Sequence, residues 1–190
     1  MKRLSRSFEY IFAEDDWFNS VLIGGLYIVL SPLVVGLIMV MGFQVELTRN
    51  VLRGEKRMPL WRHPAILLRS GIRSFAVSLC YAAVIIFILV FLQIPVISLT
   101  TVIVLGSLHL FLNPLLIRRY AVTHSIWKSL DPIALAKSAV ERFPSYCGGI
   151  IVTSILIIAA VMFGWMWIVV GWPILIFLMM IVQTIYFTEQ

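Results

Sequence analysis

Few residues in the apolar segments of this chain could take part in chemistry. Besides serines and threonines such as Ser78, Ser107, Thr153 and Ser154, those segments contain one imidazole and three amide side chains: His109, Gln93, Asn113 and Gln183. His109 and Asn113 are four residues apart, so a helix places both on one face. An ionisable group inside a membrane is costly and therefore a functional candidate, but a neutral histidine can also hydrogen-bond between helices. We expect a small polar site here, either structural or part of a solute pathway.

Motifs that would indicate an enzyme are missing from the sequence. It has no GxSxG, Walker, HExxH or GxGxxG motif and no carboxylate pair within an apolar segment. Cys80 and Cys147 are 67 residues apart, without a partner at metal-binding spacing. His63 and His124 read as solvated loop residues. We therefore expect no catalytic residue, no cofactor and no metal site, and a protein that is not an enzyme.

The composition predicts the surroundings of the chain. Apolar residues make up 61% of the 190 residues, charged residues 13%, and the mean hydropathy is +1.01. Soluble domains are about 45 to 50% apolar and about 25% charged. A soluble globule, a coiled coil, a disordered chain and a secreted disulfide scaffold are thereby excluded. We expect a single membrane domain over residues 1–190.

Uncharged apolar stretches define the expected fold class. About 20 helical residues span a bilayer core of roughly 30 Å. Five stretches of about that length lack Asp, Glu, Lys and Arg, at 21–43, 75–95, 96–117, 148–170 and 172–187. They are too continuous for barrel strands. We expect an all-α integral membrane bundle, with four full transmembrane helices in two hairpins (75–117 and 148–187) and a proline-broken N-terminal element.

The basic residues indicate the orientation. Segment 44–74 carries seven Lys or Arg and segment 118–147 carries five, whereas the turns near Pro95 and Gly171 carry none. We expect the chain to lie in the cell (inner) membrane. By the positive-inside rule the basic segments are on its cytoplasmic side and the two turns are on its outer side. We expect the basic residues to contact anionic lipid headgroups, because they flank membrane helices. Lipid contact and topology account for their charge, so we expect no nucleic acid partner. The predicted headgroup contacts are Arg49, Arg53, Lys56, Arg57, Arg118 and Arg119.

The first apolar stretch, 21–43, has two possible forms because Pro32 lies in its middle. A kinked helix would span the membrane and place the N-terminus outside. Two half-helices of about 15 Å each would instead form a re-entrant hairpin and keep the N-terminus inside. Hydropathy favours the span. The hairpin, which keeps all fifteen basic residues inside, is our preferred form.

Two amphipathic segments are expected at the cytoplasmic surface. Within 1–20, Phe8, Ile11 and Phe12 share a helical face. Within 118–147, Asp131 can cap a helix that begins at Pro132. Its apolar residues follow at three- and four-residue steps: Ile133, Ala136, Val140 and Phe143. Such helices bind lipid headgroups or dock a partner.

Small residues spaced four apart predict close helix packing. The pairs are Ala76 with Cys80, Ser78 with Ala82, and Gly149 with Thr153. These faces could be internal or could face another subunit.

Short motifs along nearly the whole chain resemble an uncharacterised prokaryotic membrane family, the domain of unknown function 4013 (DUF4013). They are Glu14-Asp15-Asp16-Trp17, Ile23-Gly24-Gly25, Pro32, Gly42-Phe43, Arg49, Arg53-Gly54, Met58-Pro59-Leu60-Trp61, Gly71, Tyr81, Pro114, Arg119-Tyr120-Ala121 and Arg142-Phe143-Pro144-Ser145-Tyr146. The chain departs from the family in its short outer loops and nearly absent C-terminal tail. The resemblance implies a compact multi-pass helical protein and supplies no activity, cofactor or catalytic residue.

Two functions follow from these observations. We expect a non-catalytic accessory, scaffold or assembly subunit of a larger membrane complex, with a membrane protein partner or a second copy of itself. The alternative is a small transporter or channel whose pathway runs near Pro32, His109 and Asn113.

Overall fold

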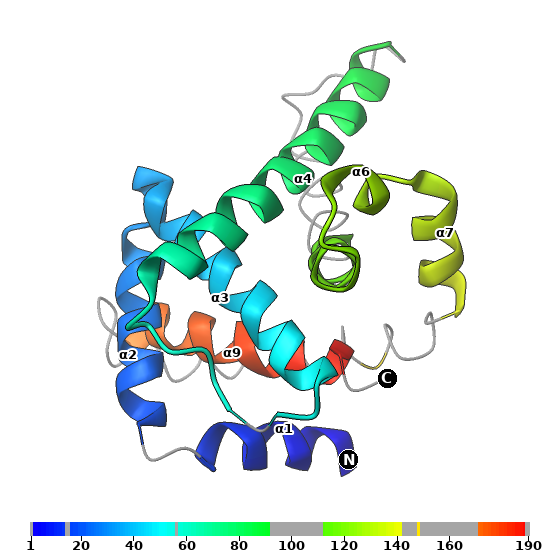
Figure 1. Ribbon diagram of the computed structural model, residues 1–190. Coiled ribbons are helices and arrows are strands. Elements are labelled where there is room, and N and C mark those ends of the chain that lie inside the picture. Colours follow the sequence, from blue (N-terminus) through cyan, green and yellow to red (C-terminus); the bar gives the residue numbers. More distant parts are fainter. Residues whose placement is uncertain are drawn as a thin grey trace.

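The computed structural model describes residues 2–13, 16–55, 57–91, 112–141, 148 and 171–188. Every regular element within these ranges is a helix, which confirms the predicted all-α class. Residues 112–123 are helical. The other helices are α1 (Lys2–Phe12), α2 (Trp17–Val29), the 3-10 helix η1 (Ser31–Leu33), α3 (Val35–Leu52), α4 (Pro64–Phe91), α6 (Ile126–Ser129), α7 (Pro132–Glu141) and α9 (Gly171–Thr188) (Figure 1).

Helix α1 confirms the amphipathic segment predicted at the N-terminus. It lies beneath the other helices in Figure 1 and packs against α9. Ile11 is fully buried, whereas Phe12 on the predicted apolar face is exposed. The Tyr10 hydroxyl accepts a hydrogen bond from the Arg57 N–H at 3.1 Å, which fixes α1 to the connection after α3.

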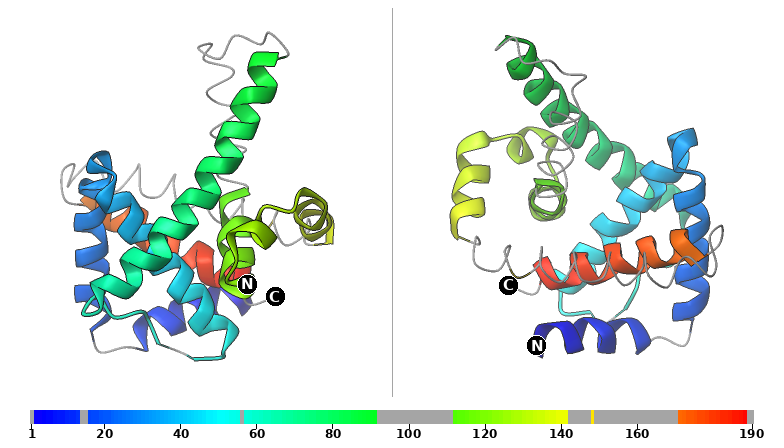
Figure 2. Two further views of the ribbon diagram at one scale, coloured as in Figure 1. Left: turned by 45° about the horizontal axis from the view of Figure 1, so that its top comes forward. Right: turned by 180° about the vertical axis from the view of Figure 1, so that it is seen from behind.

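Helices α2 and α3 form a V-shaped hairpin with η1 at its tip (Figures 1 and 2). Pro32 lies at the start of η1, where its missing N–H breaks no helical hydrogen bond. Near the start of α2, the Ser20 carbonyl accepts a hydrogen bond at 3.0 Å from the indole N–H of Trp61, which lies in the connection between α3 and α4. The stretch 21–43, predicted to be broken at Pro32, is therefore interrupted there and forms parts of two separate helices.

The connection between α3 and α4 is shorter than the basic loop predicted at 44–74. Helix α3 continues to Leu52 and α4 begins at Pro64, so only residues 53–63 connect them. Hydropathy marks where apolar side chains end, but a helix can continue into polar sequence because its hydrogen bonds join backbone groups. The guanidinium groups of Arg49, Arg69 and Arg73 are consequently carried on helices.

Helices α3 and α4 cross at very close range. A Cβ atom on Gly42 would lie 1.9 Å from the Leu67 carbonyl oxygen, and one on Gly71 would lie 2.0 Å from the Ile38 carbonyl oxygen. Only hydrogen fits at both positions, so each glycine lets its helix touch the backbone of the other.

Helix α9 crosses α2 and α3 on the side away from α4 (Figure 2). It approaches α2 at a glycine pair, since a Cβ on Gly24 would enter the Phe177 ring and one on Gly25 would lie 2.9 Å from Ile174. The Trp61 indole stacks between Tyr27 and Phe43 beside the same Phe177, with ring centroids 4.9 and 4.8 Å away. This aromatic cluster fills the core between α1, α2, α3 and α9.

A second core surrounds the helix at 112–123 and extends to α4, α6 and α7. Asp131 caps α7 as predicted, accepting the N–H groups of Ile133 at 3.0 Å and Ala134 at 3.3 Å. The apolar face of α7 differs from the prediction. Leu135 packs into the core, while Ile133 and Val140 are exposed.

Three described helices are long and apolar enough to cross a membrane: Val35–Leu52, Pro64–Phe87 and Gly171–Thr188. The last two contain the described parts of the stretches predicted at 75–95 and 172–187. Most of the predicted stretches 96–117 and 148–170 lies outside the described residues. The chain is therefore a helical protein compatible with a membrane location.

Candidate functional site: an amide-lined cavity between three helices

A cavity of about 280 Å³, with a mostly apolar surface, lies between α3, the helix at 112–123 and α9. Each helix contributes one side-chain amide, from Gln44, Asn113 and Gln183 respectively. The rest of its described lining consists of Thr48, Pro114, Ile117, Ile176, Met180, Thr184, Phe187 and Thr188. None of these residues carries a formal charge, so the described lining combines neutral hydrogen-bonding groups with apolar walls.

Gln44 is the most enclosed of the three amides. Its side chain is only 5% exposed, and its Oε1 atom has no hydrogen-bond partner among the described residues. Thr48 lies one turn further along α3 and donates its hydroxyl proton to the Gln44 backbone carbonyl at 2.8 Å. A buried acceptor without a donor costs about 1 to 3 kcal/mol. Because Oε1 itself is buried, a group bound in the cavity could donate to it only after the Gln44 side chain turned toward the cavity.

Asn113 is held in place by α4. Its Oδ1 atom accepts a hydrogen bond from the Ser78 hydroxyl at 3.3 Å. This contact leaves the two N–H donors of the Asn113 amide available to another acceptor. Pro114 follows directly, and the pair lines the cavity from the start of the described part of this helix.

Helix α9 presents its polar residues on one face. Gln183 is half-buried, and the hydroxyls of Thr184 and Thr188 are buried beside it. Each threonine donates its proton to the carbonyl one turn earlier, at 2.7 Å for Met180 and 2.6 Å for Thr184. Their hydroxyl oxygens keep acceptor lone pairs. The cavity thus offers both donors and acceptors to a ligand.

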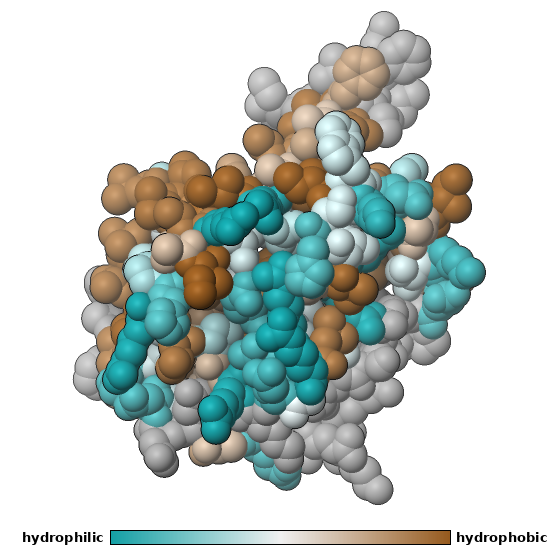
Figure 3. All heavy atoms as spheres, viewed as in Figure 1, coloured by the Kyte–Doolittle hydropathy of each residue, from teal (hydrophilic) through white to brown (hydrophobic). Residues whose placement is uncertain are grey.

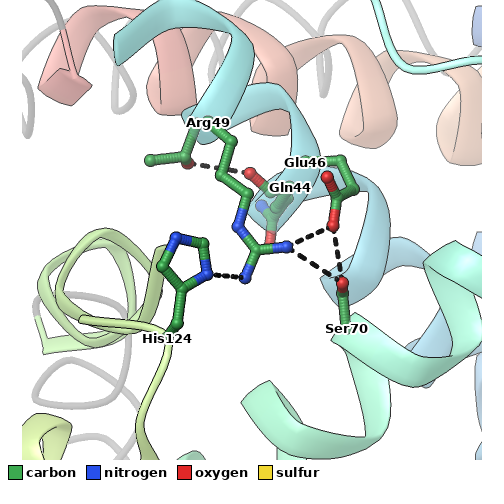
Figure 4. A network of polar contacts seen from close by, with 6 residues as sticks. Gln44, Glu46, Arg49, Ser70 and His124 are labelled. Carbon is green, nitrogen blue, oxygen red and sulfur yellow. Dashed lines mark hydrogen bonds and ion pairs between the residues drawn. The ribbon is translucent and has the colours of Figure 1, made fainter. Parts of the chain in front are cut away.

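A network of charged groups lies on another face of α3, next to the cavity (Figure 4). Arg49 forms an ion pair with Glu46 at 2.5 Å, and Ser70 of α4 donates its hydroxyl proton to the same carboxylate at 2.6 Å. Arg49 also contacts the His124 Nδ1 atom at 3.0 Å and lies over the Tyr120 ring. Since a guanidinium only donates, His124 accepts through Nδ1 and carries its proton on Nε2.

The sequence of this chain was compared with known families and proteins. The family described as "Protein of unknown function (DUF4013)" matches residues 25–187. The chain belongs to this family. Comparisons with curated proteins and with solved structures found no match. The match confirms the resemblance to DUF4013 that the sequence motifs indicate.

The structure brings together two of the four predicted polar residues of this DUF4013 chain. Asn113 and Gln183 line one cavity. Gln93 and His109 lie outside the described residues. Pro32, the other residue of the predicted pathway, lies at the hairpin tip and is not among the described lining of the cavity.

The predicted packing pairs are only partly described. Ala76 and Ala82 are half-buried, and Cys80 is exposed. Gly149 and Thr153 lie outside the described residues. Among the described residues, the closest approaches between helices occur at glycines that the four-residue spacing did not single out.

The basic residues predicted to contact headgroups have different surroundings. Arg53 and Arg57 are exposed, and Arg118 is half-buried. Arg119 donates to the carbonyls of Lys128 at 2.9 Å and Asp131 at 3.1 Å, so it joins α6 and α7 to the helix at 112–123. The Arg49 guanidinium is occupied by the Glu46 network, and Lys56 lies outside the described residues.

Sequence analysis missed the part of the site that α3 contributes. Gln44 and Thr48 were assigned to the loop at 44–74, although their four-residue spacing is typical of one helix face. The predictions do not include Thr184 and Thr188 of α9, because these residues lie at the end of an otherwise apolar stretch. His124 was read as a solvated residue; it is exposed, but it also contacts Arg49.

Proposed function

We propose that this DUF4013 protein is a multi-pass membrane protein that binds a small uncharged polar solute and acts as its transporter or channel. The observation that carries the proposal is the convergence of Gln44, Asn113 and Gln183 from three helices on one cavity. Polar groups within apolar helices are costly unless they are paired or used. The convergence of three amides on one cavity therefore favours a ligand-binding role over a purely structural role for these side chains.

The lining indicates the chemistry of the solute. Amides donate and accept hydrogen bonds, and no described lining residue would balance a charge on the ligand. The volume of about 280 Å³ is just below the range of about 300 to 1,000 Å³ for small-molecule pockets. A polyol, urea or small amide fits within this volume and has matching hydrogen-bonding groups.

The proposed placement in the cell membrane has four transmembrane helices in the hairpins 75–117 and 148–187 and a re-entrant element at Pro32. The basic residues Arg53 and Arg57 are exposed in the connection that also contacts α1, which supports a shared cytoplasmic side for both. Arg118 follows Asn113 within two helical turns. The cavity would then lie toward the cytoplasmic side.

Solute entry into liposomes tests the transport proposal. Protein-containing and empty liposomes are mixed with excess glycerol or urea, and reswelling is followed by stopped-flow light scattering. We expect faster entry with protein, and entry about fivefold or more slower for Asn113→Leu and Gln183→Leu, because each removes a hydrogen-bonding group worth about 1 to 3 kcal/mol. Asn19→Leu, at an exposed amide outside the cavity, is the control. Entry rates equal to those of empty liposomes would contradict the proposal.

An accessory role in a larger membrane complex is the second candidate function. It is supported by the exposed apolar residues of α6 and α7, which lie outside the three candidate spans. Trp127 is 83% exposed, Ile133 80% and Val140 74%. Large apolar side chains outside the lipid are typical of a surface that contacts a protein or the headgroup region.

Purification in mild detergent at native expression separates the two functions. For an accessory subunit, fixed partner proteins co-purify, and Ile133→Gln with Val140→Gln releases them while solute entry stays unchanged. For a transporter, the cavity variants alone change the measured flux. A partner protein and the absence of enzymatic activity remain predictions.

A further inference from the structure

A second cavity, of about 530 Å³, lies beside the charged face of α3. Its described lining comes from α3, α4 and the end of the helix at 112–123, and we call it the arginine groove. The argument rests on Glu46, Arg49, Ile66, Arg69, Arg73 and His124, all of which line it. Figure 3 shows hydrophilic side chains gathered over this part of α3 and the start of α4, with hydrophobic side chains next to them.

The arginine groove carries excess positive charge. Its described lining contains three guanidinium groups and one carboxylate. The carboxylate of Glu46 is already occupied by Arg49 and Ser70. The charges of Arg69 and Arg73 therefore remain uncompensated within the described lining.

Arg69 and Arg73 are placed to hold one anion between them. They are four residues apart on α4, which puts both on one helix face, and both are exposed. Like charges at this spacing destabilise a helix by a few tenths of a kcal/mol. An anion bound between them would remove this repulsion.

Arg49 forms the fixed side of the arginine groove. Glu46, Ser70 and His124 orient its guanidinium, and the Tyr120 ring lies 5.7 Å beneath it. Those contacts use three of its five N–H donors. The neutral His124 ring carries an N–H at Nε2, so it too can donate to an anion.

We propose that the arginine groove binds a phosphate group through Arg69 and Arg73, with Arg49 as a fixed positive charge behind them. Guanidinium groups match the oxygens of phosphate in pairs. The phosphate can come from an anionic lipid headgroup or from a free phosphate. Ile66, which is 54% exposed in the lining, provides an apolar surface that a lipid could contact.

Binding to delipidated full-length protein in neutral detergent tests the proposal. Isothermal titration compares short-chain phosphatidylglycerol, short-chain phosphatidylcholine and inorganic phosphate as probes. We expect one phosphatidylglycerol or one phosphate per chain, and little binding of the net-neutral lipid. Arg69→Gln with Arg73→Gln should weaken binding at least about tenfold, since the change removes the charge-assisted hydrogen bonds of both guanidinium groups to the phosphate.

The matched control removes two other arginines. Arg53→Gln with Arg57→Gln changes the net charge equally at exposed residues outside the described lining. We expect less than about a twofold effect, because solvent and salt screen these distant charges. Arg69→Lys with Arg73→Lys should retain part of the affinity, since it keeps the charge and loses the paired donors.

The outcomes separate the two phosphate sources. Binding of phosphatidylglycerol alone assigns the arginine groove to a lipid headgroup, and binding of inorganic phosphate with the same dependence on Arg69 and Arg73 assigns it to a free phosphate. Equal losses in the two Gln double variants would overturn the proposal, because they would indicate general surface charge. Failure of both probes to bind would overturn it as well.

Discussion

Gly42 and Gly71 lie at the crossing of α3 and α4, where each faces a backbone carbonyl of the other helix. Gly42 lies against Leu67, four residues before Gly71, and Gly71 lies against Ile38, four residues before Gly42. The contact is thus reciprocal, and on α3 it lies one turn before Glu46. The ion-pair network that joins α3 to α4 depends on this close approach.

Replacing Gly42 with Ala should therefore separate the two helices. The added Cβ meets a backbone oxygen that cannot rotate away, so we expect a loss of about 1 to 3 kcal/mol in unfolding free energy. Reversible unfolding in mixed detergent micelles measures the change. Ala83→Leu adds volume at an exposed position of α4 and should have little effect. Equal stability of Gly42→Ala and the wild type would rule out the crossing described here.

Trp61, which is half-buried, should contribute more to stability than the exposed Trp127. Trp61→Phe removes the indole hydrogen bond to Ser20 and part of the stacking on Tyr27 and Phe43, at a cost of about 1 to 2 kcal/mol. Trp127→Phe, at an 83% exposed side chain, should stay within about 0.5 kcal/mol. Thermal unfolding in detergent compares them. Similar losses for the two variants would be inconsistent with the aromatic cluster.

Replacing Val34 with Gly should stabilise the protein. It has a φ angle of 62°, which is unfavourable for a β-branched residue, and its side chain is 48% exposed. We expect Val34→Gly to raise the unfolding free energy by about 1 kcal/mol, because glycine adopts this conformation without strain. At the neighbouring helical position, Val35→Gly should lower it by up to about 1 kcal/mol. A lower melting temperature for both variants would show that Val34 is not strained.

The α2–α3 hairpin predicts that α1 and the 53–63 connection lie on the same side of the membrane. Tyr10 contacts the backbone of Arg57, so the two segments cannot be separated by a bilayer. In a background with Cys80→Ala and Cys147→Ala, cysteines introduced by Glu9→Cys and Arg53→Cys should react with an impermeant maleimide only in inside-out vesicles. Labelling of the Glu9→Cys variant in intact cells would exclude this arrangement.

Much of the fold follows from short-range patterns. The helix begun by Asp131 and Pro132 and the apolar helix at 171–188 were predicted close to their observed positions, because capping and hydropathy depend on neighbouring residues. The ends of helices that lie in polar sequence were not predicted correctly. Helices α3 and α4 extend into the predicted loop at 44–74, where backbone hydrogen bonds continue without apolar side chains.

Composition and spacing are sufficient to predict that the chain is helical, that it is apolar enough for a membrane, that its basic residues are unevenly distributed and that it has few polar side chains such as Asn113 and Gln183. Which of these side chains meet depends on how the helices pack. Gln44 joins them because α3 crosses its neighbours at glycine contacts, and the crossing geometry depends on residues far apart in the sequence. Spacing along one helix determines which residues share a face, but the helix packed against that face is a property of the whole fold.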